Sequence, residues 1–233
     1  MLNWLSPEEW QAVALSLKVA VWATLCSLPF GIAMAWLLAR RNFWGRSLLS
    51  ALVHLPLVLP PVVTGYVLLL ALGKKAWLGA LLADHLGLVF SFRWTGAALA
   101  GAVMGFPLLV RAIRLSIEAV DLKLEAAAST LGASPFWVFL TITLPLALPG
   151  VLAGMVLCFA KAMGEFGATI TFVSNIPNQT QTLPSAIYSY TQVPGGDGDA
   201  LRLTLVSVVV SLGAVLLSEW LAQRATRKRD ALR

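Results

Sequence analysis

The stretch Phe136-Trp-Val-Phe-Leu-Thr-Ile-Thr-Leu-Pro-Leu-Ala-Leu-Pro-Gly-Val-Leu-Ala-Gly-Met-Val-Leu-Cys-Phe-Ala160 contains no charged residue. A helix of about 20 apolar residues is long enough to cross the hydrocarbon core of a bilayer. Such a helix also satisfies its backbone hydrogen bonds internally, which a lipid environment requires. We therefore predict that residues 136–160 form a transmembrane helix, so that the segments at its two ends lie on opposite sides of a membrane.

The composition of the whole chain agrees with this interpretation. Of its 233 residues, 58% are hydrophobic and 12% are charged, and the mean hydropathy is +0.81. A soluble domain carries about 25% charged residues, so an ordinary soluble fold is excluded. About five spans of roughly 20 residues each leave enough chain for loops and surface helices, but not for a separate large soluble domain. We expect one all-α integral membrane domain over residues 1–233.

Four further stretches have spanning length and little or no charge. They are residues 15–39, 48–72, 94–110 and 203–218. Another apolar stretch, residues 76–92, carries Asp84 and His85 near its centre. A carboxylate at the middle of a bilayer costs about 2.5–3.5 kcal/mol. We therefore predict that this stretch is an interfacial helix or a re-entrant segment, with a sixth span as the alternative.

Prolines interrupt the first two predicted spans. Pro29 lies in the first, and Pro56, Pro60 and Pro61 lie in the second. Each removes a backbone hydrogen bond and bends its helix, which a membrane tolerates where neighbouring groups satisfy the freed backbone. The pattern indicates either broken helices that line a transport pathway or the ordinary prolines of membrane helices.

The distribution of basic residues predicts the orientation, because cytoplasmic loops carry the excess of Lys and Arg. If five spans alternate, eleven of the 17 basic residues fall on one side. They are Arg40, Arg41, Arg46, Arg111, Arg114, Lys123, Arg224, Arg227, Lys228, Arg229 and Arg233. This side is predicted to be cytoplasmic, with the N-terminus outside and the C-terminus inside. The net charge of +6 is then explained by topology rather than by a nucleic-acid partner.

The segment that precedes the quoted stretch, residues 111–136, is the longest predicted cytoplasmic loop. Asp121 is placed to cap a short helix, and Gly132 can end that helix in the left-handed conformation. Ser134 and Pro135 are typical of the start of the next helix. The three consecutive alanines at residues 126–128 permit close approach by another protein. We therefore predict a helix that docks into a partner, with Leu131 as its exposed apolar contact.

This loop resembles that of the permease subunits of bacterial ABC importers, in which Gly, nine residues, Ile, one residue and Leu-Pro follow an Ala-rich signature. Here Gly132 is followed by nine residues and then by Ile142-Thr-Leu-Pro145. The Glu-Ala-Ala that leads the signature is normally three residues before the Gly, whereas four residues separate Glu125-Ala-Ala127 from Gly132. Either Ala126 occupies the Glu position, or Glu125 serves from one residue earlier.

The resemblance implies an ABC importer permease fold with about five transmembrane helices, or six, and a cytoplasmic coupling helix. Coupling to an ATP-hydrolysing subunit would then involve Glu125, Ala126, Ala127, Leu131 and Gly132. The chain has no Gly-x4-Gly-Lys-Ser/Thr sequence of its own. ATP and Mg²⁺ would therefore be bound by the partner, and this chain is predicted to be a transport subunit without catalytic residues, cofactor or metal.

The segment that follows the quoted stretch begins the predicted outer loop, residues 164–201. Lys161 and Glu165 are four positions apart and share a helix face. Ionisable groups near the end of a membrane helix usually face a partner or a watery cavity. The pair is predicted to be either a gate, flexed at Gly164 and Gly167, or a static ion pair between helices.

Residues 164–177, Gly-Glu-Phe-Gly-Ala-Thr-Ile-Thr-Phe-Val-Ser-Asn-Ile-Pro, resemble the molybdate branch of the sulfate and molybdate permeases, as do residues 182–188 and 191–196. The resemblance implies molybdate import by a permease homodimer with two ATP-binding subunits and a periplasmic molybdate-binding protein, in the bacterial cytoplasmic (inner) membrane. Sulfate or tungstate transport, or ion-coupled secondary transport, are the alternatives. The candidate hydrogen-bond donors to the ion beside the gate are Thr169, Thr171, Ser174 and Asn175, with Lys161 as an added source of attraction.

Overall fold

The computed structural model describes residues 4–230, and every regular element in that range is a helix. Side chains are described except at residues 218, 219 and 221–230, so the side chains of the basic residues predicted at the C-terminal end, and the whole of Arg233, lie outside the described residues. The elements are α1 (Pro7–Arg40), α2 (Arg46–Val58), α3 (Pro61–Leu72), α4 (Trp77–Leu86), α5 (Trp94–Glu118), α6 (Leu122–Thr130), α7 (Pro135–Val138), the π-helical turn η1 (Phe139–Thr143), α8 (Leu144–Met163), α9 (Gly167–Val173), α10 (Leu183–Thr191) and α11 (Asp197–Asp230).

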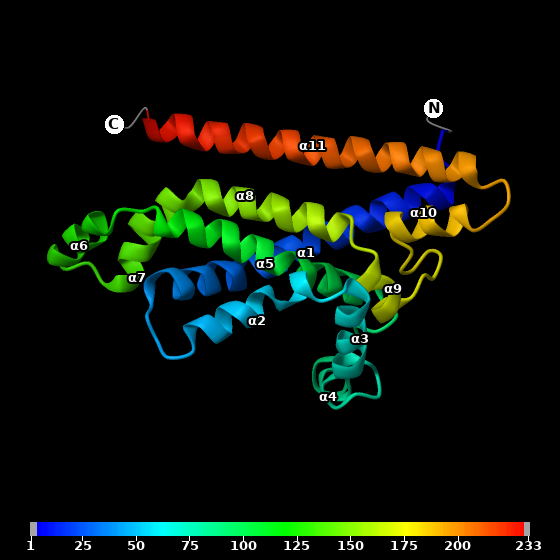
Figure 1. Ribbon diagram of the computed structural model, residues 1–233, viewed down its shortest axis with the longest axis horizontal. Helices are drawn as coiled ribbons and strands as arrows, with labels where there is room; N and C mark the ends of the chain where they lie inside the picture. Colours follow the sequence, from blue (N-terminus) through cyan, green and yellow to red (C-terminus); the bar gives the residue numbers. More distant parts are fainter. Residues whose placement is uncertain (1–3, 231–233) are drawn as a thin grey trace.

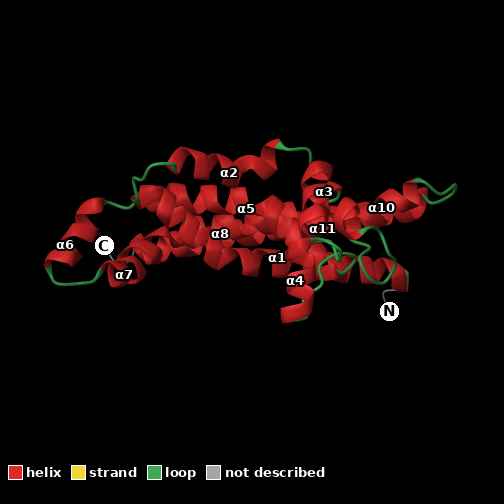
Figure 2. Ribbon diagram, turned by 90° about the horizontal axis from the view of Figure 1, so that it is seen from below, coloured by secondary structure: helices red, strands yellow, loops and turns green. Residues whose placement is uncertain are grey.

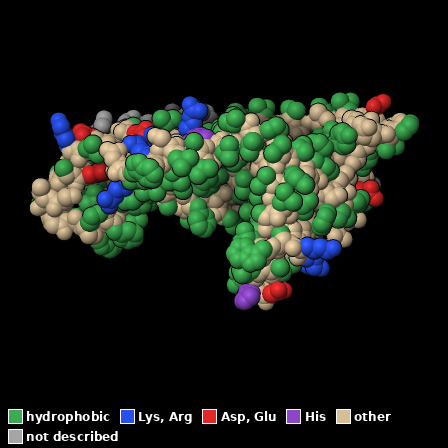
Figure 3. All heavy atoms as spheres, turned by 60° about the horizontal axis from the view of Figure 1, so that its bottom comes forward, with side chains coloured by type: hydrophobic (Ala, Val, Ile, Leu, Met, Phe, Trp, Pro, Cys, Tyr) green, Lys and Arg blue, Asp and Glu red, His purple; other side chains and the backbone are tan. Residues whose placement is uncertain are grey.

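The long helices run side by side along the longest axis of the molecule (Figure 1). The α6–α7 loop and the C-terminal end of α11 lie at one end of this axis, and the start of α1 and α10 lie at the other. Figure 2 shows the same arrangement from below, with α6 and α7 again far from the N-terminus. Hydrophobic side chains cover the middle of the face in Figure 3, whereas most charged side chains lie toward its ends and at the tip of a lobe.

Four helical stretches within the described residues are long and apolar enough to cross a membrane. They are Pro7–Arg40, Trp94–Glu118, Pro135–Met163 and Asp197–Leu217, and the pair α2 and α3 makes up to five if it counts as one broken span. These stretches include four of the five predicted spans. The third span is longer than predicted, because α5 continues through Arg111 and Arg114 to Glu118.

The second predicted span, residues 48–72, is two helices rather than one. α2 and α3 are bent by 113° relative to one another. The break falls at Leu59, which is extended (φ −70°, ψ 142°), because the ring of a following proline disfavours the helical conformation. Pro61 then begins α3 at a position where a missing N–H does no harm.

The apolar stretch at residues 76–92 contains only a short helix. α4 has 10 residues, so it is about 15 Å long, half the thickness of the hydrocarbon core. Gly87 ends it with φ +64°. The alternative of a sixth span is therefore wrong, and the prediction of an interfacial or re-entrant segment agrees with this length.

The core of the molecule is the contact of α5 with α1 and α8, where small residues let the helix backbones approach closely. A methyl group on Gly105 of α5 would lie 2.7 Å from Cys158 Sγ, and one on Gly154 of α8 would lie 3.0 Å from the Leu109 carbonyl oxygen. A methyl group on Gly31 of α1 would lie 2.6 Å from Cδ2 of the Leu109 side chain. Since lipid tails are as apolar as leucine, such close contact, rather than exclusion of water, holds membrane helices together.

We expect Gly105→Ala to lower the stability of the solubilised protein, because the new methyl group would collide with Cys158. Overfilling a close-packed core costs about 1–3 kcal/mol. Gly213→Ala is the matched control, because nothing lies within 4 Å of the added methyl group, and alanine is favoured in helices by up to about 1 kcal/mol. Thermal unfolding in detergent measures both variants, and equal melting temperatures would contradict the prediction.

Candidate functional site

The α6–α7 loop has the local structure that its sequence predicts. The Lys123 backbone N–H donates to Asp121 Oδ1 at 2.9 Å, which caps α6. Gly132 follows α6 with φ +86°, and Ser134 and Pro135 stand at the start of α7. α7 is not separate, because it continues through η1 into α8 as the first turn of a spanning helix.

The tip of this loop is uncovered. Leu131 is 89% exposed, and nothing lies within 4 Å of a methyl group placed on Gly132. Ala126 and Ala127 are also exposed, and α6 buries none of its residues. Four of the five residues predicted to couple the chain to a partner therefore form one accessible surface.

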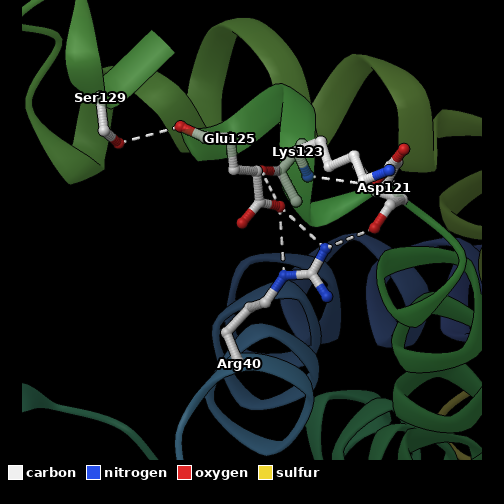
Figure 4. A network of polar contacts seen from close by, with 7 residues as sticks. Arg40, Asp121, Lys123, Glu125 and Ser129 are labelled. Atoms are coloured by element: carbon white, nitrogen blue, oxygen red, sulfur yellow. Dashed lines mark hydrogen bonds and ion pairs between the residues drawn. The ribbon is translucent and has the colours of Figure 1, made fainter. Parts of the chain in front are cut away.

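Glu125, the fifth predicted coupling residue, faces the membrane helices instead (Figure 4). Its Oε1 accepts hydrogen bonds from Arg40 Nη2 at 2.8 Å, from Arg40 Nε at 3.1 Å and from the Thr143 hydroxyl at 2.9 Å. Arg40 also donates to the Val120 carbonyl oxygen at 3.2 Å. The side chains of Arg40 and Glu125 are 12% and 19% exposed. Glu125 therefore joins α6 to the end of α1 and to the π-helical turn that begins the next span.

Sequence reasoning did not identify the partners of Glu125. Arg40 is 85 positions away and was counted only as one of the basic residues that define topology. Its place in the last turn of α1 also complements the negative end of that helix dipole. Thr143 is buried at the end of η1, and the single-turn π-helix is a distortion that often accompanies functional sites. No local sequence pattern predicts the contact of Glu125 with Arg40 or with Thr143, because these residues are 85 and 18 positions away from it.

We expect Glu125→Gln to loosen α6 without unfolding the membrane helices, because a charge-assisted contact to Arg40 is lost. Losses of this kind in partly buried positions are about 1–3 kcal/mol. Hydrogen exchange of residues 122–134 in the solubilised protein should accelerate accordingly.

Glu118→Gln is the matched control for that measurement. Glu118 pairs with Arg114 at the same 2.8 Å, but both side chains are more exposed, at 36% and 28%, and exposed pairs contribute about 0–1 kcal/mol. An equal effect of both substitutions on residues 122–134 would contradict the anchoring role of Glu125.

The second predicted site, at the end of α8, is a break between two helices. α8 ends at Met163 and α9 begins at Gly167. Glu165 lies in the break, and its Oε2 accepts a hydrogen bond from Lys161 Nζ at 2.6 Å, while its Oε1 accepts one from the Ala168 backbone N–H at 2.9 Å. The Glu165 side chain is 1% exposed and that of Lys161 is 29% exposed. Glu165 therefore both pairs with Lys161 and caps α9.

Two of the predicted donors beside the gate, Thr169 and Thr171, are turned toward the backbone. The Thr169 hydroxyl donates to the carbonyl oxygens of Phe166 at 2.8 Å and Glu165 at 3.1 Å. The Thr171 hydroxyl donates to the Gly167 carbonyl oxygen at 2.9 Å. A hydroxyl has one hydrogen to donate. In this conformation, Thr169 and Thr171 stabilise α9 and do not offer their donors to an ion.

The two glycines of the predicted gate have different surroundings. Around Gly164 there is room for a side chain, whereas a methyl group on Gly167 would lie 2.8 Å from Pro61 Cβ of α3. Gly65 of α3 likewise meets the backbone of Ala168. Gly167 is therefore required for the close contact between the short helices α3 and α9. Gly164 lies in the break itself, where a side chain would fit.

A further ion pair fastens α11 to α1 at the N-terminal end of the molecule. Glu9 is buried, and its Oε1 lies 3.3 Å from Nη2 of Arg202, which also pairs with Asp199. Burial, together with the neighbouring carboxylates of Glu9, Glu8 and Asp199, raises the pKa of Tyr190 above its ordinary value. The phenol therefore remains neutral at physiological pH. In the described part of the chain, no group of three or more His, Cys, Asp or Glu residues could hold a metal ion.

The arrangement of the helices matches that of a solved ABC transporter. A chain from the crystal structure of a bacterial ABC transporter involved in the import of the acidic polysaccharide alginate aligns with 95% of this chain and 81% of its own length. The TM-score is 0.74 at 17% sequence identity. A match at this identity defines the fold alone, which is that of the helical membrane subunits of ABC importers.

Sequence comparison identifies the family. The family model described as the binding-protein-dependent transport system inner membrane component matches residues 27–227. The molybdenum transport system permease protein ModB of Escherichia coli strain K12 is 58% identical over 225 residues, which are 97% of this chain and 98% of that protein. The ModB protein of Haemophilus influenzae is 59% identical over 220 residues, 94% of this chain and 96% of its own. The chain belongs to the family of binding-protein-dependent transport system inner membrane components.

Membership in this family confirms the predicted class. The chain is a multi-pass membrane protein and a permease subunit of an ABC transporter, not an enzyme. A binding-protein-dependent permease implies an ATPase partner and a binding-protein partner. The fold prediction of an all-α permease with about five spans is confirmed as well.

Proposed function

We propose that this chain forms the translocation path of a molybdate importer. The observation that carries the proposal is its near full-length identity of 58% and 59% to two proteins named as molybdenum transport system permeases. The proposed complex contains two copies of this chain, two ATP-binding subunits that hold ATP and Mg²⁺, and a periplasmic molybdate-binding protein. The binding protein supplies most of the recognition, and the permease passes the ion on.

The proposed orientation places the α6–α7 loop in the cytoplasm. The basic residues Arg40, Arg46, Arg111, Arg114 and Lys123 flank or belong to this end of the helices, and cytoplasmic loops are enriched in such residues. The C-terminal end of α11 lies at the same end of the long axis, and the start of α1 lies at the other (Figure 1). This arrangement supports an outside N-terminus and an inside C-terminus.

In the proposed mechanism, the exposed surface of Ala126, Ala127, Leu131 and Gly132 docks into the ATPase subunit. When the two ATPase subunits close on ATP, they move this surface. The contact of Glu125 with Arg40 and Thr143 then transmits the displacement to α1 and α8. Glu125 thus acts within this chain, while the alanines and Leu131 meet the partner.

The break between α8 and α9 is the proposed gate. Its supporting observations are a buried carboxylate paired with a partly exposed ammonium at the end of a spanning helix, and the close contact of Gly167 with α3. Ionisable groups at such a place usually mark a substrate path. Because α3 follows the break in the second span, movement of one short helix requires movement of the other.

We expect the complex of this chain with its ATPase and binding protein, reconstituted in liposomes, to accumulate radiolabelled molybdate only when ATP is present. Excess unlabelled molybdate should abolish the signal and sulfate should compete weakly. Tungstate is a tetrahedral dianion of nearly equal size, and we expect it to compete strongly. ATP-independent uptake would contradict the energy source, and strong competition by sulfate would favour a sulfate permease.

We expect Gly132→Val to abolish uptake while leaving the protein inserted in the membrane. A β-branched residue is strained at φ +86°, so the tip that carries Leu131 would change shape where it meets the ATPase. Gly87→Val is the control, because Gly87 also has a positive φ and open surroundings but lies at the end of α4, far from the α6–α7 loop (Figure 1). Normal uptake by the Gly132 variant, or equal loss in both variants, would contradict docking through this tip.

A further inference from the structure

Glu165 and Lys161 are unequal partners in their ion pair. Both carboxylate oxygens of Glu165 accept hydrogen bonds, one from Lys161 Nζ at 2.6 Å and one from the Ala168 backbone N–H at 2.9 Å, and the side chain is 1% exposed. Lys161 is 29% exposed, and an ammonium has three donors, of which Glu165 takes one. The pair therefore consists of a fixed, enclosed carboxylate and an ammonium with one accessible side.

The accessible side of Lys161 lies on a stripe of α8 that the chain leaves uncovered. Leu157, Ala160 and Gly164 are exposed on the same side of the helix end. Two of these three residues are small, so a dehydrated or partly hydrated ion can approach the ammonium without meeting a bulky side chain. The hydroxyl hydrogens of Thr169 and Thr171 are held by backbone carbonyl oxygens, and the Asn175 amide donates to Ser189 Oγ. Lys161, in contrast, keeps donors beyond the one that bonds to Glu165.

We propose that the exposed side of the Lys161 ammonium is a transient contact for the transported tetrahedral oxyanion, and that Glu165 keeps this contact weak. The inference rests on the proposed function, because it names a place on the path of that ion. The Glu165 carboxylate lies within hydrogen-bond distance of the ammonium, so from farther away the two charges act as a dipole rather than as a net positive charge. A dianion is then attracted at short range but is not trapped.

A weak contact is what transport through a low-dielectric region requires. Binding must be favourable enough for the ion to enter and weak enough for it to leave. A lone ammonium at this position would hold a dianion too tightly, and a lone carboxylate would repel it. The Ala168 N–H fixes the carboxylate by capping α9, so Glu165 stays beside Lys161 and does not swing away when the ion arrives.

The test measures equilibrium binding of radiolabelled molybdate to the detergent-solubilised permease–ATPase complex without the binding protein. Glu165→Gln keeps the size of the side chain and one acceptor oxygen, which can still accept from the Ala168 N–H, but it removes the negative charge beside Lys161. We expect it to tighten binding by about tenfold or more, the effect of removing one opposing charge a few ångströms from the ion. Its turnover in ATP-dependent uptake should fall, because release becomes slow.

The complementary variants separate a direct contact from other effects. Lys161→Met should weaken binding by about tenfold or more, and Lys161→Arg should retain it, because the positive charge remains. Lys18→Met is the matched control. Lys18 is another lysine within a spanning helix, and its ammonium lies 3.8 Å from the ring centre of Trp94 in α5. Its removal should leave molybdate affinity unchanged.

Two results would overturn the inference. If Lys161→Met and Glu165→Gln both lower the melting temperature while molybdate affinity stays that of the wild type, the pair is a static link between α8 and α9. If Lys18→Met weakens binding as much as Lys161→Met, the ion is attracted by the overall positive charge of the protein and not by a contact with Lys161. Wild-type uptake of molybdate is measured separately, on the same complex reconstituted in liposomes with the binding protein and ATP. Absence of that uptake would show failure of the proposed substrate independently of the binding results.

Discussion

The close approach of α5 to α1 and α8 is the constraint on which the other features depend. In a bilayer the apolar surfaces of helices gain little by meeting one another, so association relies on contact between backbones at small residues. Gly105 against Cys158 and Gly154 against Leu109 provide such contacts along the α5–α8 interface. Because these glycines determine how α8 packs against α5, they also determine where the two ends of α8 lie relative to the rest of the molecule. One end carries the loop that faces a partner, and the other carries the break with Lys161 and Glu165.

The short helix α3 of the broken second span packs against α9, the short helix that follows α8. α2 and α3 are bent by 113°, and α8 and α9 are separated by a short break, yet α3 and α9 meet through Gly65 and Gly167 with no room for a side chain on either. The polar side chains at the start of α9 are satisfied locally, as a membrane requires, whereas the buried Thr64 hydroxyl of α3 has no hydrogen-bond partner. Glu165 accepts from the Ala168 N–H of α9, and the Thr169 and Thr171 hydroxyls donate to carbonyl oxygens just before α9 and at its first residue. The short helices therefore form one packed unit at the side of the bundle.

Sequence reasoning succeeded where the cause of a structure is local. Asp121, Gly132 and Pro135 fix the ends of α6 and α7 through capping and backbone preference, and the structure places all three where those rules require. It failed where the cause is distant. Pro60 predicts a bend but not its size, because the direction of α3 depends on its contact with α9. The partner of Glu125 could not be predicted, because Arg40 lies 85 positions away on another helix and no spacing links the two.

Glu125 and Glu165 solve the same physical problem at opposite ends of one spanning helix. Each is a carboxylate withdrawn from water and neutralised by a cation, and each has a further hydrogen bond that fixes its position, from Thr143 in one case and from the Ala168 N–H in the other. Thr143 stands at the start of α8, and Lys161 stands in its last turn. In the proposed mechanism, a displacement of α6 therefore reaches the gate through a single helix. The π-helical turn between α7 and α8 is the place where that helix departs from ideal geometry, so it is where the displacement can be absorbed or passed on.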